Sequence, residues 1–392
     1  MNLLQEEAPP AVFAAYTDPG RVQALLQAHV QAVFGRDCQL MRCSVLHSAY
    51  RSYLRPASWA KSTLSVCYRV DLHSEHDVII YARIFLNGQS HAAWASLAPT
   101  VHAVPEAAPR HVAALDMIVW RFPFDPAMLQ MPTLLSAEQM RPYLPYAQLP
   151  PGFQRPEEIA RLKVQRVGYV PEHACTVRYR LASQVDDAAA PRALTLYGKT
   201  YHGDRPREVS RCHEYLWRTV GAGAAALKMA QPLGYDAALN VFWQLGIAGG
   251  ALGEAIAASN YEHYLNQAGH GLALIHRSDL ASSATVSEAS LGAECLKKID
   301  KLVDAHPACA LQLATLRARV QRTSAPSPAR LIHGDFHAGQ LLVDGSSVCF
   351  LDFDSFAMGE PEQDLAEFIV SLLFANFAPE LVRSMAAALL AA

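Results

Sequence analysis

The stretch from Arg330 to Ala366 constrains the fold more than any other part of this 392-residue chain. It reads RLIHGDFHAGQLLVDGSSVCFLDFDSFAMGEPEQDLA. The pattern predicts a strand over 330–332, a polar loop, a hairpin that turns at Asp344-Gly345, and a second strand over 348–351. An acidic tripeptide follows the second strand directly. The stretch therefore predicts two polar loops that a short hairpin holds side by side.

The hairpin is expected to bring Asp335, Gln340 and Asp352 close together. Phosphoryl transfer needs a carboxylate at the attacking hydroxyl group and oxygen ligands that hold magnesium on the nucleotide phosphates. Carboxylate and amide oxygens suit such a hard cation. Asp335 is the candidate for the hydroxyl group, and Gln340, Asp352 and Asp354 are the candidates for the metal.

A wider set of residues carries a resemblance to a known family. The set comprises His333-Gly334-Asp335, Gln340, Leu351-Asp352-Phe353-Asp354, Gly359 and Asp364-Leu365-Ala366. In this set the chain resembles the aminoglycoside phosphotransferase and choline kinase family, whose members are small-molecule kinases with a protein-kinase-like fold. The resemblance covers most of residues 160–376.

The resemblance implies a role for each residue of the loops. Asp335 is then the catalytic base, Gln340 and Asp352 bind magnesium, and Asp364 anchors the catalytic loop, which His333 also supports. The family usually has asparagine where Gln340 stands. Glutamine keeps the amide oxygen and adds a methylene group, and maltokinase-like members resemble this chain in having it.

The region upstream supplies a candidate nucleotide lobe. A hairpin is predicted over 164–181, followed by a strand over 193–201 that carries Lys199 and by a helix that begins after Asp204. This order suits a lysine that binds the α- and β-phosphates. By resemblance Lys199 pairs with a helix glutamate. Glu214 fits that spacing better than Glu208, although helix periodicity does not separate the two.

Three further features of this region need an explanation. The hairpin turn, 171–174, has no glycine, and it places Glu172 where phosphates are expected. That carboxylate must point away or be compensated. The glycine-rich segment 246–254 is expected to join the two lobes. His276 is interpreted as a packing histidine and not as a catalytic one.

An internal repeat links the first and second thirds of the chain. Tyr53 lies as far from Tyr81 as Tyr169 lies from Tyr197, and short matches lie between them. Further matches follow in AALDM at 113–117 with AALKM at 225–229, and in FDPA at 124–127 with YDAA at 235–238. We interpret the repeat as a duplicated β-lobe in which Arg83 falls at the position of Lys199.

The predicted fold class is α+β. We expect a protein-kinase-like, two-lobed fold with a β-rich N-lobe over 151–246 and a helical C-lobe over 247–392. Residues 1–150 are expected to form an extra α+β domain that resembles a duplicated N-lobe without a catalytic loop. In that domain a helix is predicted over 21–34 and strands over 63–72 and 78–85.

Composition narrows the choice of partners. Thirty-three Lys and Arg against 36 Asp and Glu give a net charge of −3, and no basic block is present, so nucleic acid is an unexpected partner. No apolar stretch is long enough to cross a membrane. The eight cysteines form no CxxC pair, and MNLLQEEAPP does not resemble a signal peptide, so we expect reduced thiols and a cytoplasmic location. The oligomeric state stays open.

The leading hypothesis is an ATP- and magnesium-dependent O-phosphotransferase, with GTP as a second possible donor. Its acceptor would be a hydroxyl group on a sugar, an amino alcohol or an aminoglycoside. The alternative is a pseudokinase-like protein that binds a nucleotide or a partner with little transfer activity. A third reading takes His333, Asp335 and His337 as transition-metal ligands of a hydrolase.

Overall fold

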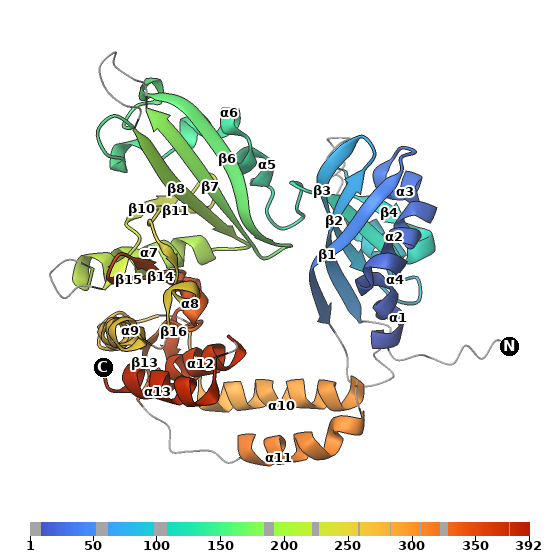
Figure 1. Cartoon of the computed structure of the whole chain (residues 1–392). Helices are drawn as coiled ribbons and strands as arrows, with labels where there is room; N and C mark the ends of the chain where they lie inside the picture. Colours follow the sequence, from blue (N-terminus) through green and yellow to red (C-terminus); the bar gives the residue numbers. More distant parts are fainter. Residues whose placement is uncertain are drawn as a thin grey trace. The chain divides into compact units, whose positions relative to one another are not determined.

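The computed structural model describes residues 9–51, 62–97, 108–183, 192–221, 227–257, 259–282, 284–305, 307–321, 328–375 and 377–392. Two compact units form within the chain (Figure 1). The first unit comprises Met1–Met140, Arg166–Cys175 and Asp304–Pro307, and the second comprises Arg141–Gln165, Thr176–Val303 and Ala308–Ala392. None of the described helices is both long and apolar enough to span a membrane.

The first unit is a five-stranded antiparallel sheet with helices packed against it (Figure 1). The strand order is β1-β2-β3-β5-β4. The strands are β1 (Leu40–Arg51), β2 (Thr63–Leu72), β3 (Glu75–Ile84), β4 (Arg110–Val112) and β5 (Met117–Arg121). Helices α1 (Pro9–Thr17), α2 (Pro19–Ala28), α3 (Val30–Phe34) and α4 (Gln89–Ser96) contact this sheet. The range of the unit also includes α5 (Met131–Leu135) and α6 (Ala137–Met140).

The core of this unit lies between the sheet and the first three helices. Val22, Leu26 and Val33 pack there against alternate residues of β2 and β3. The single helix predicted over 21–34 is wrong, because the chain forms α2 and α3 instead. His29 leaves helical geometry at φ −120° and ψ 25°, and its N–H bonds the carbonyls of Gln27 and Leu26.

The second unit contains a sheet with the order β10-β11-β8-β7-β6. Its strands are β6 (Ile159–Val170), β7 (Ala174–Ser183), β8 (Ala193–Tyr201), β10 (Pro232–Asp236) and β11 (Val241–Leu245). Helix α7 (Arg205–Thr219) follows β8 and buries Val209, Cys212 and Leu216 on one face. The predicted strand over 193–201 is confirmed, and so is the helix after Asp204.

The rest of the second unit is mainly helical, with short strands. The helices are α8 (Leu252–Ala255), α9 (Tyr261–His276), α10 (Glu288–Ala305), α11 (Ala310–Val320), α12 (Pro361–Phe374) and α13 (Pro379–Leu390). The strands are β9 (Lys228–Met229), β12 (Gly250–Ala251), β13 (Arg330–Ile332), β14 (Leu341–Asp344), β15 (Ser347–Phe350) and β16 (Ala357–Gly359). β14 and β15 form the predicted hairpin, and β13 pairs with β16.

The two large sheets share one strand order, because each joins its strands in the chain order 1-2-3-5-4 with a helix after the third strand. They also share a register: Arg83 lies opposite Ile118, and Lys199 lies opposite Phe242. The two downstream sequence matches are nevertheless wrong. Met117 begins β5 whereas Met229 lies in β9, which belongs to another sheet, and Asp125 follows β5 whereas Asp236 ends β10. Tyr53 lies outside the described residues.

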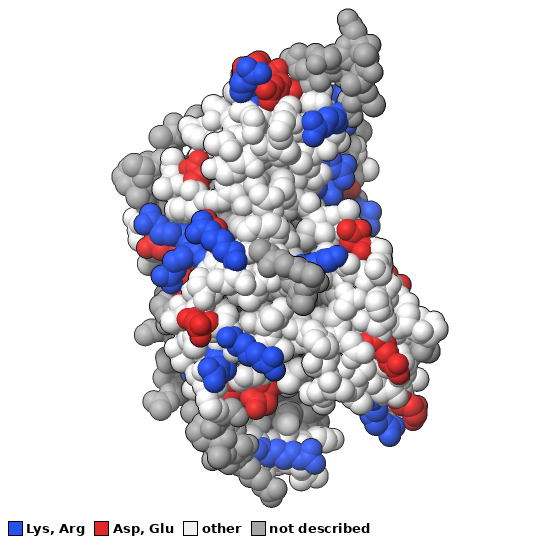
Figure 2. All heavy atoms as spheres, turned by 90° about the vertical axis from the view of Figure 1, so that its left-hand side faces the viewer, with Lys and Arg blue, Asp and Glu red and all other residues white. Residues whose placement is uncertain are grey.

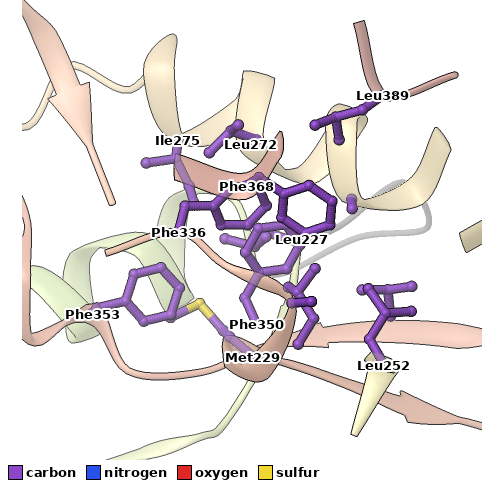
Figure 3. Packing of buried hydrophobic residues seen from close by; sticks show 14 of the residues in the cluster. Leu227, Met229, Leu252, Leu272, Ile275, Phe336, Phe350, Phe353, Phe368 and Leu389 are labelled. Carbon is purple, nitrogen blue, oxygen red and sulfur yellow. The ribbon is translucent and has the colours of Figure 1, made fainter. Parts of the chain in front are cut away.

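Aromatic rings dominate the core beneath the two polar loops (Figure 3). Phe336 stacks against Phe350 and Phe368, with ring centroids 5.6 and 5.1 Å apart. Phe353 is fully buried in the same cluster. Because Phe336 adjoins Asp335 and Phe353 lies between two aspartates, burial of these rings fixes the backbone from which the polar side chains project.

Candidate active site

The first loop, which follows β13, is fixed by one buried carboxylate. Asp364, in the first turn of α12, has no exposed surface. It accepts hydrogen bonds from the backbone N–H groups of His333 and Gly334, each at 2.8 Å. His276 lies 2.9 Å from the same side chain through Nε2. The histidine interpreted as a packing residue therefore also orients the carboxylate that anchors this loop.

Gly334 allows the two loops to approach each other closely. Its φ is +79°, in the left-handed region. A Cβ atom at this position would run into the carbonyl oxygen of Ser355, which belongs to the second loop. Only glycine satisfies both conditions without strain, so the sequence His-Gly-Asp has a direct steric reason.

Asp335 lies on the exposed side of the first loop, with 53% of its side chain accessible. Gln340, in the short 3₁₀ turn Ala338–Gln340, donates through Nε2 to Asp335 at 3.3 Å. Helix α12 holds the backbone between them, because Glu367 accepts from the N–H of Phe336 and Ser371 accepts from the N–H of Ala338. The structure thus brings together two of the predicted site residues.

The second loop, Asp352 to Ser355, surrounds the ammonium group of Lys199. The Nζ atom lies 2.6 Å from Asp352 and 3.2 Å from Asp354. Lys199 is only 7% exposed. Burial alone would lower the pKa of Lys199, but the charges of Asp354 and Asp352 more than offset it and raise the pKa above its ordinary value. Lys199 is therefore a buried cation held by two carboxylates.

The structure does not bring Glu214 to Lys199. Glu214 accepts a hydrogen bond from Ser210 at 3.0 Å and lies 3.8 Å from Arg218, both on its own helix. It also lines a cavity of about 280 Å³ with Trp217. The Lys199–Glu214 pair therefore remains a prediction. The other candidate, Glu208, forms an ion pair with Arg205 at 2.9 Å.

Two buried histidines pack against the Phe353 ring. The centroids of His333 and His213 lie 5.1 and 5.3 Å from that of Phe353. Nε2 of His333 bonds the carbonyl of Leu351 at 2.9 Å, and Nε2 of His213 bonds that of Ala230 at 2.7 Å. Burial lowers the pKa of His333, and it lowers the pKa of His213 to about 3. Both rings are therefore neutral near pH 7.

Sequence reasoning missed His213 and Arg205 as parts of this site. The signal for His213 was a histidine on the apolar stripe of a helix, which usually means simple packing. Arg205 stands in the first turn of α7, where a basic residue is unfavourable to the helix dipole. That unfavourable placement could have pointed to a tertiary partner.

The turn between β6 and β7 resolves the question raised by Glu172. Within the first unit the carboxylate of Glu172 forms an ion pair with Arg83. Its N–H donates to Asp125 at 2.8 Å, and Tyr169 donates to the same oxygen at 2.8 Å. Asp125 is 3% exposed. Arg83 thus compensates the negative charge of Glu172. Compensation was one of the two outcomes expected from the sequence, the other being a carboxylate that points away.

The donor set can be tested against magnesium. In the described part of the chain, no group of three or more His, Cys, Asp and Glu side chains could hold a metal ion alone. Magnesium, however, is commonly held by one or two carboxylates with the remaining ligands from phosphates and water. Asp352 and Asp354 converge on the ammonium group of Lys199, so this pair already accepts one cation, and Gln340 donates to Asp335 through its NH₂ group and not through its oxygen. These donors fit magnesium on a nucleotide.

Because the described residues contain no group of three or more His, Cys, Asp and Glu side chains that could hold a metal ion, the structure gives no support to a transition-metal site at His333, Asp335 and His337. His333 is fully buried, and its ring packs on Phe336 and Phe353.

On the face drawn in Figure 2, Lys and Arg side chains lie in small separate groups, several of them beside Asp or Glu. That face shows no continuous basic tract of the kind that follows a nucleic-acid backbone.

Comparison with known proteins places the site in a family. Residues 183–392, more than half of the chain, match the model of the phosphotransferase enzyme family. The matched region contains Lys199 and both polar loops. No curated protein matches the chain.

The solved structures that this comparison finds similar to the chain have low sequence identity to it. The ternary complex of APH(2″)-IIa with streptomycin and ATP is 14% identical and covers 59% of this chain and 79% of its own, at a TM-score of 0.41. A choline/ethanolamine kinase family protein from Mesorhizobium loti is 16% identical, with 65% and 75% covered and a TM-score of 0.40. Choline kinase LicA from Streptococcus pneumoniae is 13% identical, with 58% and 75% covered and a TM-score of 0.36.

Proposed function

We propose, from the premise that this chain belongs to the phosphotransferase enzyme family, that it transfers the γ-phosphoryl group of ATP to a hydroxyl group of a small molecule. The observation that carries the proposal is the convergence of Lys199, Asp352 and Asp354 beside the loop of Asp335. The family match confirms the predicted α+β, kinase-like phosphotransferase. The nucleotide, the metal and the acceptor are the finer parts of the proposal.

In the proposed mechanism Asp335 accepts a hydrogen bond from the acceptor hydroxyl and takes its proton as the phosphoryl group arrives. The exposure of Asp335 suits contact with a substrate, and the hydrogen bond from Gln340 orients the carboxylate. Two backbone N–H groups of this loop donate to Asp364, whose carboxylate His276 orients, and these contacts keep the loop backbone in place. Preorganisation of this kind avoids a reorganisation cost during the reaction.

Lys199 is proposed to bind the α- and β-phosphates. Asp352, Asp354 and Gln340 would hold magnesium, which when bound neutralises charge on the β- and γ-phosphates. Asp352 and Asp354 hold the ammonium group of Lys199 between them, so a nucleotide meets a lysine that is already ordered. The low exposure of Lys199 strengthens its attraction for a phosphate.

The first unit is proposed to be a duplicated N-lobe. The shared strand order supports this, as does the shared register that aligns Arg83 with Lys199. The described residues of the first unit include no counterpart of the two polar loops. We therefore assign it no catalytic step of its own.

The proposed function is tested by measuring ADP formation from ATP over a panel of sugars, amino alcohols and aminoglycosides. With an acceptor found, Asp335→Ala is expected to lower kcat by roughly 100- to 10,000-fold, since general-base catalysis contributes that much. Asp344→Ala, in the exposed hairpin turn, is the matched control and keeps the parental rate. Parental transfer by Asp335→Ala would remove the base assignment.

The alternative, a pseudokinase-like protein that binds a nucleotide or a partner, predicts little transfer to any acceptor. Absence of any effect of ATP and magnesium on the thermal unfolding temperature would favour it. One motive for this reading was the carboxylate of Glu172 in the hairpin turn. Its ion pair with Arg83 weakens that motive.

A further inference from the structure

Arg205 links the helix that follows the lysine strand to the second polar loop. Its Nε donates to the carbonyl oxygen of Asp354 at 2.9 Å, and its Nη2 donates to the same oxygen and, at 3.3 Å, to that of Phe356. The guanidinium carbon also lies 4.8 Å from the centroid of the Phe356 ring. One side chain thus binds two carbonyls and one ring of the loop.

Glu208 fixes the orientation of this arginine. Its carboxylate lies 2.9 Å from Nη1 of Arg205, one turn away on α7. Both side chains are about three-quarters buried, at 27% and 23% exposed. A planar guanidinium with partners on its separate nitrogens has little freedom to rotate. Arg205 is therefore a preorganised clamp and not a mobile surface cation.

The segment that Arg205 binds needs external support. Asp352 has a φ of +59°, in the left-handed region, and Phe353–Ser355 form a single 3₁₀ turn. The last N–H of this turn, from Phe356 to Phe353, makes a long bond of 3.5 Å. A backbone in this conformation is costly for a residue other than glycine unless its surroundings hold it. The contacts from Arg205 supply part of that hold.

We infer that Arg205, oriented by Glu208, is a positioning residue for the carboxylates that hold magnesium on the nucleotide. The inference rests on the proposed function. Helix α7, which follows the strand of Lys199, is then linked to the second polar loop through the guanidinium group of Arg205 and the backbone carbonyls that it binds. Glu208 then acts on Arg205, and Glu214 acts on neither Lys199 nor the loop.

Binding of ATP to the full chain by calorimetry, with magnesium and with EDTA, tests the inference without an acceptor. We expect Arg205→Ala to weaken ATP binding in magnesium by roughly 10- to 100-fold, the usual cost of removing a residue that orients metal ligands. Affinity in EDTA should change much less. Arg205→Lys should recover part of the loss, and Glu208→Gln should lie between Arg205→Lys and Arg205→Ala.

Two controls separate this role from the alternatives. Arg211→Ala, an exposed arginine on the same helix, should bind like the parental protein. Glu214→Gln should do so as well, whereas a loss equal to that of Arg205→Ala would restore the Lys199–Glu214 pair and overturn the inference. Parental affinity of Arg205→Ala in magnesium would also overturn it.

Hydrogen exchange in the nucleotide-free protein gives a second readout. Peptides that cover 352–358 should exchange faster in Arg205→Ala than in Arg211→Ala. Unchanged exchange in this segment contradicts the inference. If Arg205→Ala does not fold, the comparison of Arg205→Lys and Glu208→Gln with the parental protein decides in its place. If the parental protein itself does not bind ATP, that result contradicts the proposed function, on which this inference rests.

Discussion

The residue with the strongest structural role in the site is Asp364, not one of the residues proposed to contact substrate. It is fully buried and meets three N–H donors, from His333, Gly334 and His276. Asp364→Asn replaces one acceptor oxygen with an NH₂ group that faces a donor. We expect it to lower the free energy of unfolding by about 2–4 kcal/mol, as buried charged hydrogen-bond partners do.

Urea unfolding of both proteins measures this loss. Asp344→Asn, in the exposed hairpin turn, provides the control and should change the free energy of unfolding by less than about 0.5 kcal/mol. If the two substitutions have equal effects, the three hydrogen bonds contribute nothing measurable.

His213 makes stability depend on pH. Burial lowers its pKa to about 3 in the folded protein, while the unfolded chain keeps the ordinary value of 6.5. Between these values the unfolded chain binds the additional proton, so this contribution is complete above about pH 6.5 and is lost as the pH falls toward 3. The slope for one such group is about 1.4 kcal/mol per pH unit.

His213→Gln can keep the hydrogen bond to Ala230 and removes the titration. Urea unfolding between pH 4 and pH 7 should therefore show a flatter rise in stability for the variant than for the parental protein. His333 contributes in the same direction in both proteins and cancels in the difference. Parallel curves would show that His213 is not buried in its neutral form.

At the scale of elements, the site depends on the contact between the two polar loops. Gly334→Ala places a Cβ atom against the carbonyl of Ser355 and imposes a left-handed φ on alanine. We expect a loss of stability of about 1–3 kcal/mol from the backbone strain, and more from the clash. Because the second loop must move, ATP binding should weaken as well. A Gly345→Ala variant, with open space at its Cβ position, controls for the strain alone.

The elements that sequence predicted well are those with a strong local signal. The strands over 63–72 and 193–201 have the predicted bounds, because they are rich in β-branched and aromatic residues. The strand over 330–332, Arg-Leu-Ile, also has the predicted bounds. The hairpin at Asp344-Gly345 also has a local turn signal. The break at His29 has no such signal, so one helix was predicted where two exist.

The site was predictable in its loops and not in its tertiary partners. Asp335, Gln340, Asp352 and Asp354 lie on two short segments whose spacing is visible in the sequence, and the structure brings them into two adjacent groups. The partners of Lys199, Asp352 and Asp354, come from the second loop, and Asp352 is 153 positions away in the sequence. Helix periodicity left Glu208 and Glu214 equivalent, and in the structure each contacts a residue of its own helix, Glu208 with Arg205 and Glu214 with Ser210.

At the scale of the whole molecule, the repeated sheet raises the question of how many nucleotide lobes the chain contains. The two sheets have the same strand order, and Arg83 occupies the place of Lys199. Their environments differ, however. Lys199 is held by two carboxylates beside the loop of Asp335, whereas Arg83 pairs with Glu172 and its guanidinium carbon lies 5.8 Å from the centroid of the Trp120 ring.

One active nucleotide lobe predicts unequal effects of removing the two cations. Lys199→Ala should weaken binding of ATP and magnesium by roughly 100-fold, because it removes a buried charge that phosphates would share. Arg83→Ala should keep ATP affinity within about threefold and act on the stability of the first unit, since its ion pair with Glu172 is partly buried. Calorimetry measures the first effect and thermal unfolding the second. Equal losses of ATP affinity would mean that both sheets serve nucleotide binding, and the duplicated lobe would then need a catalytic role.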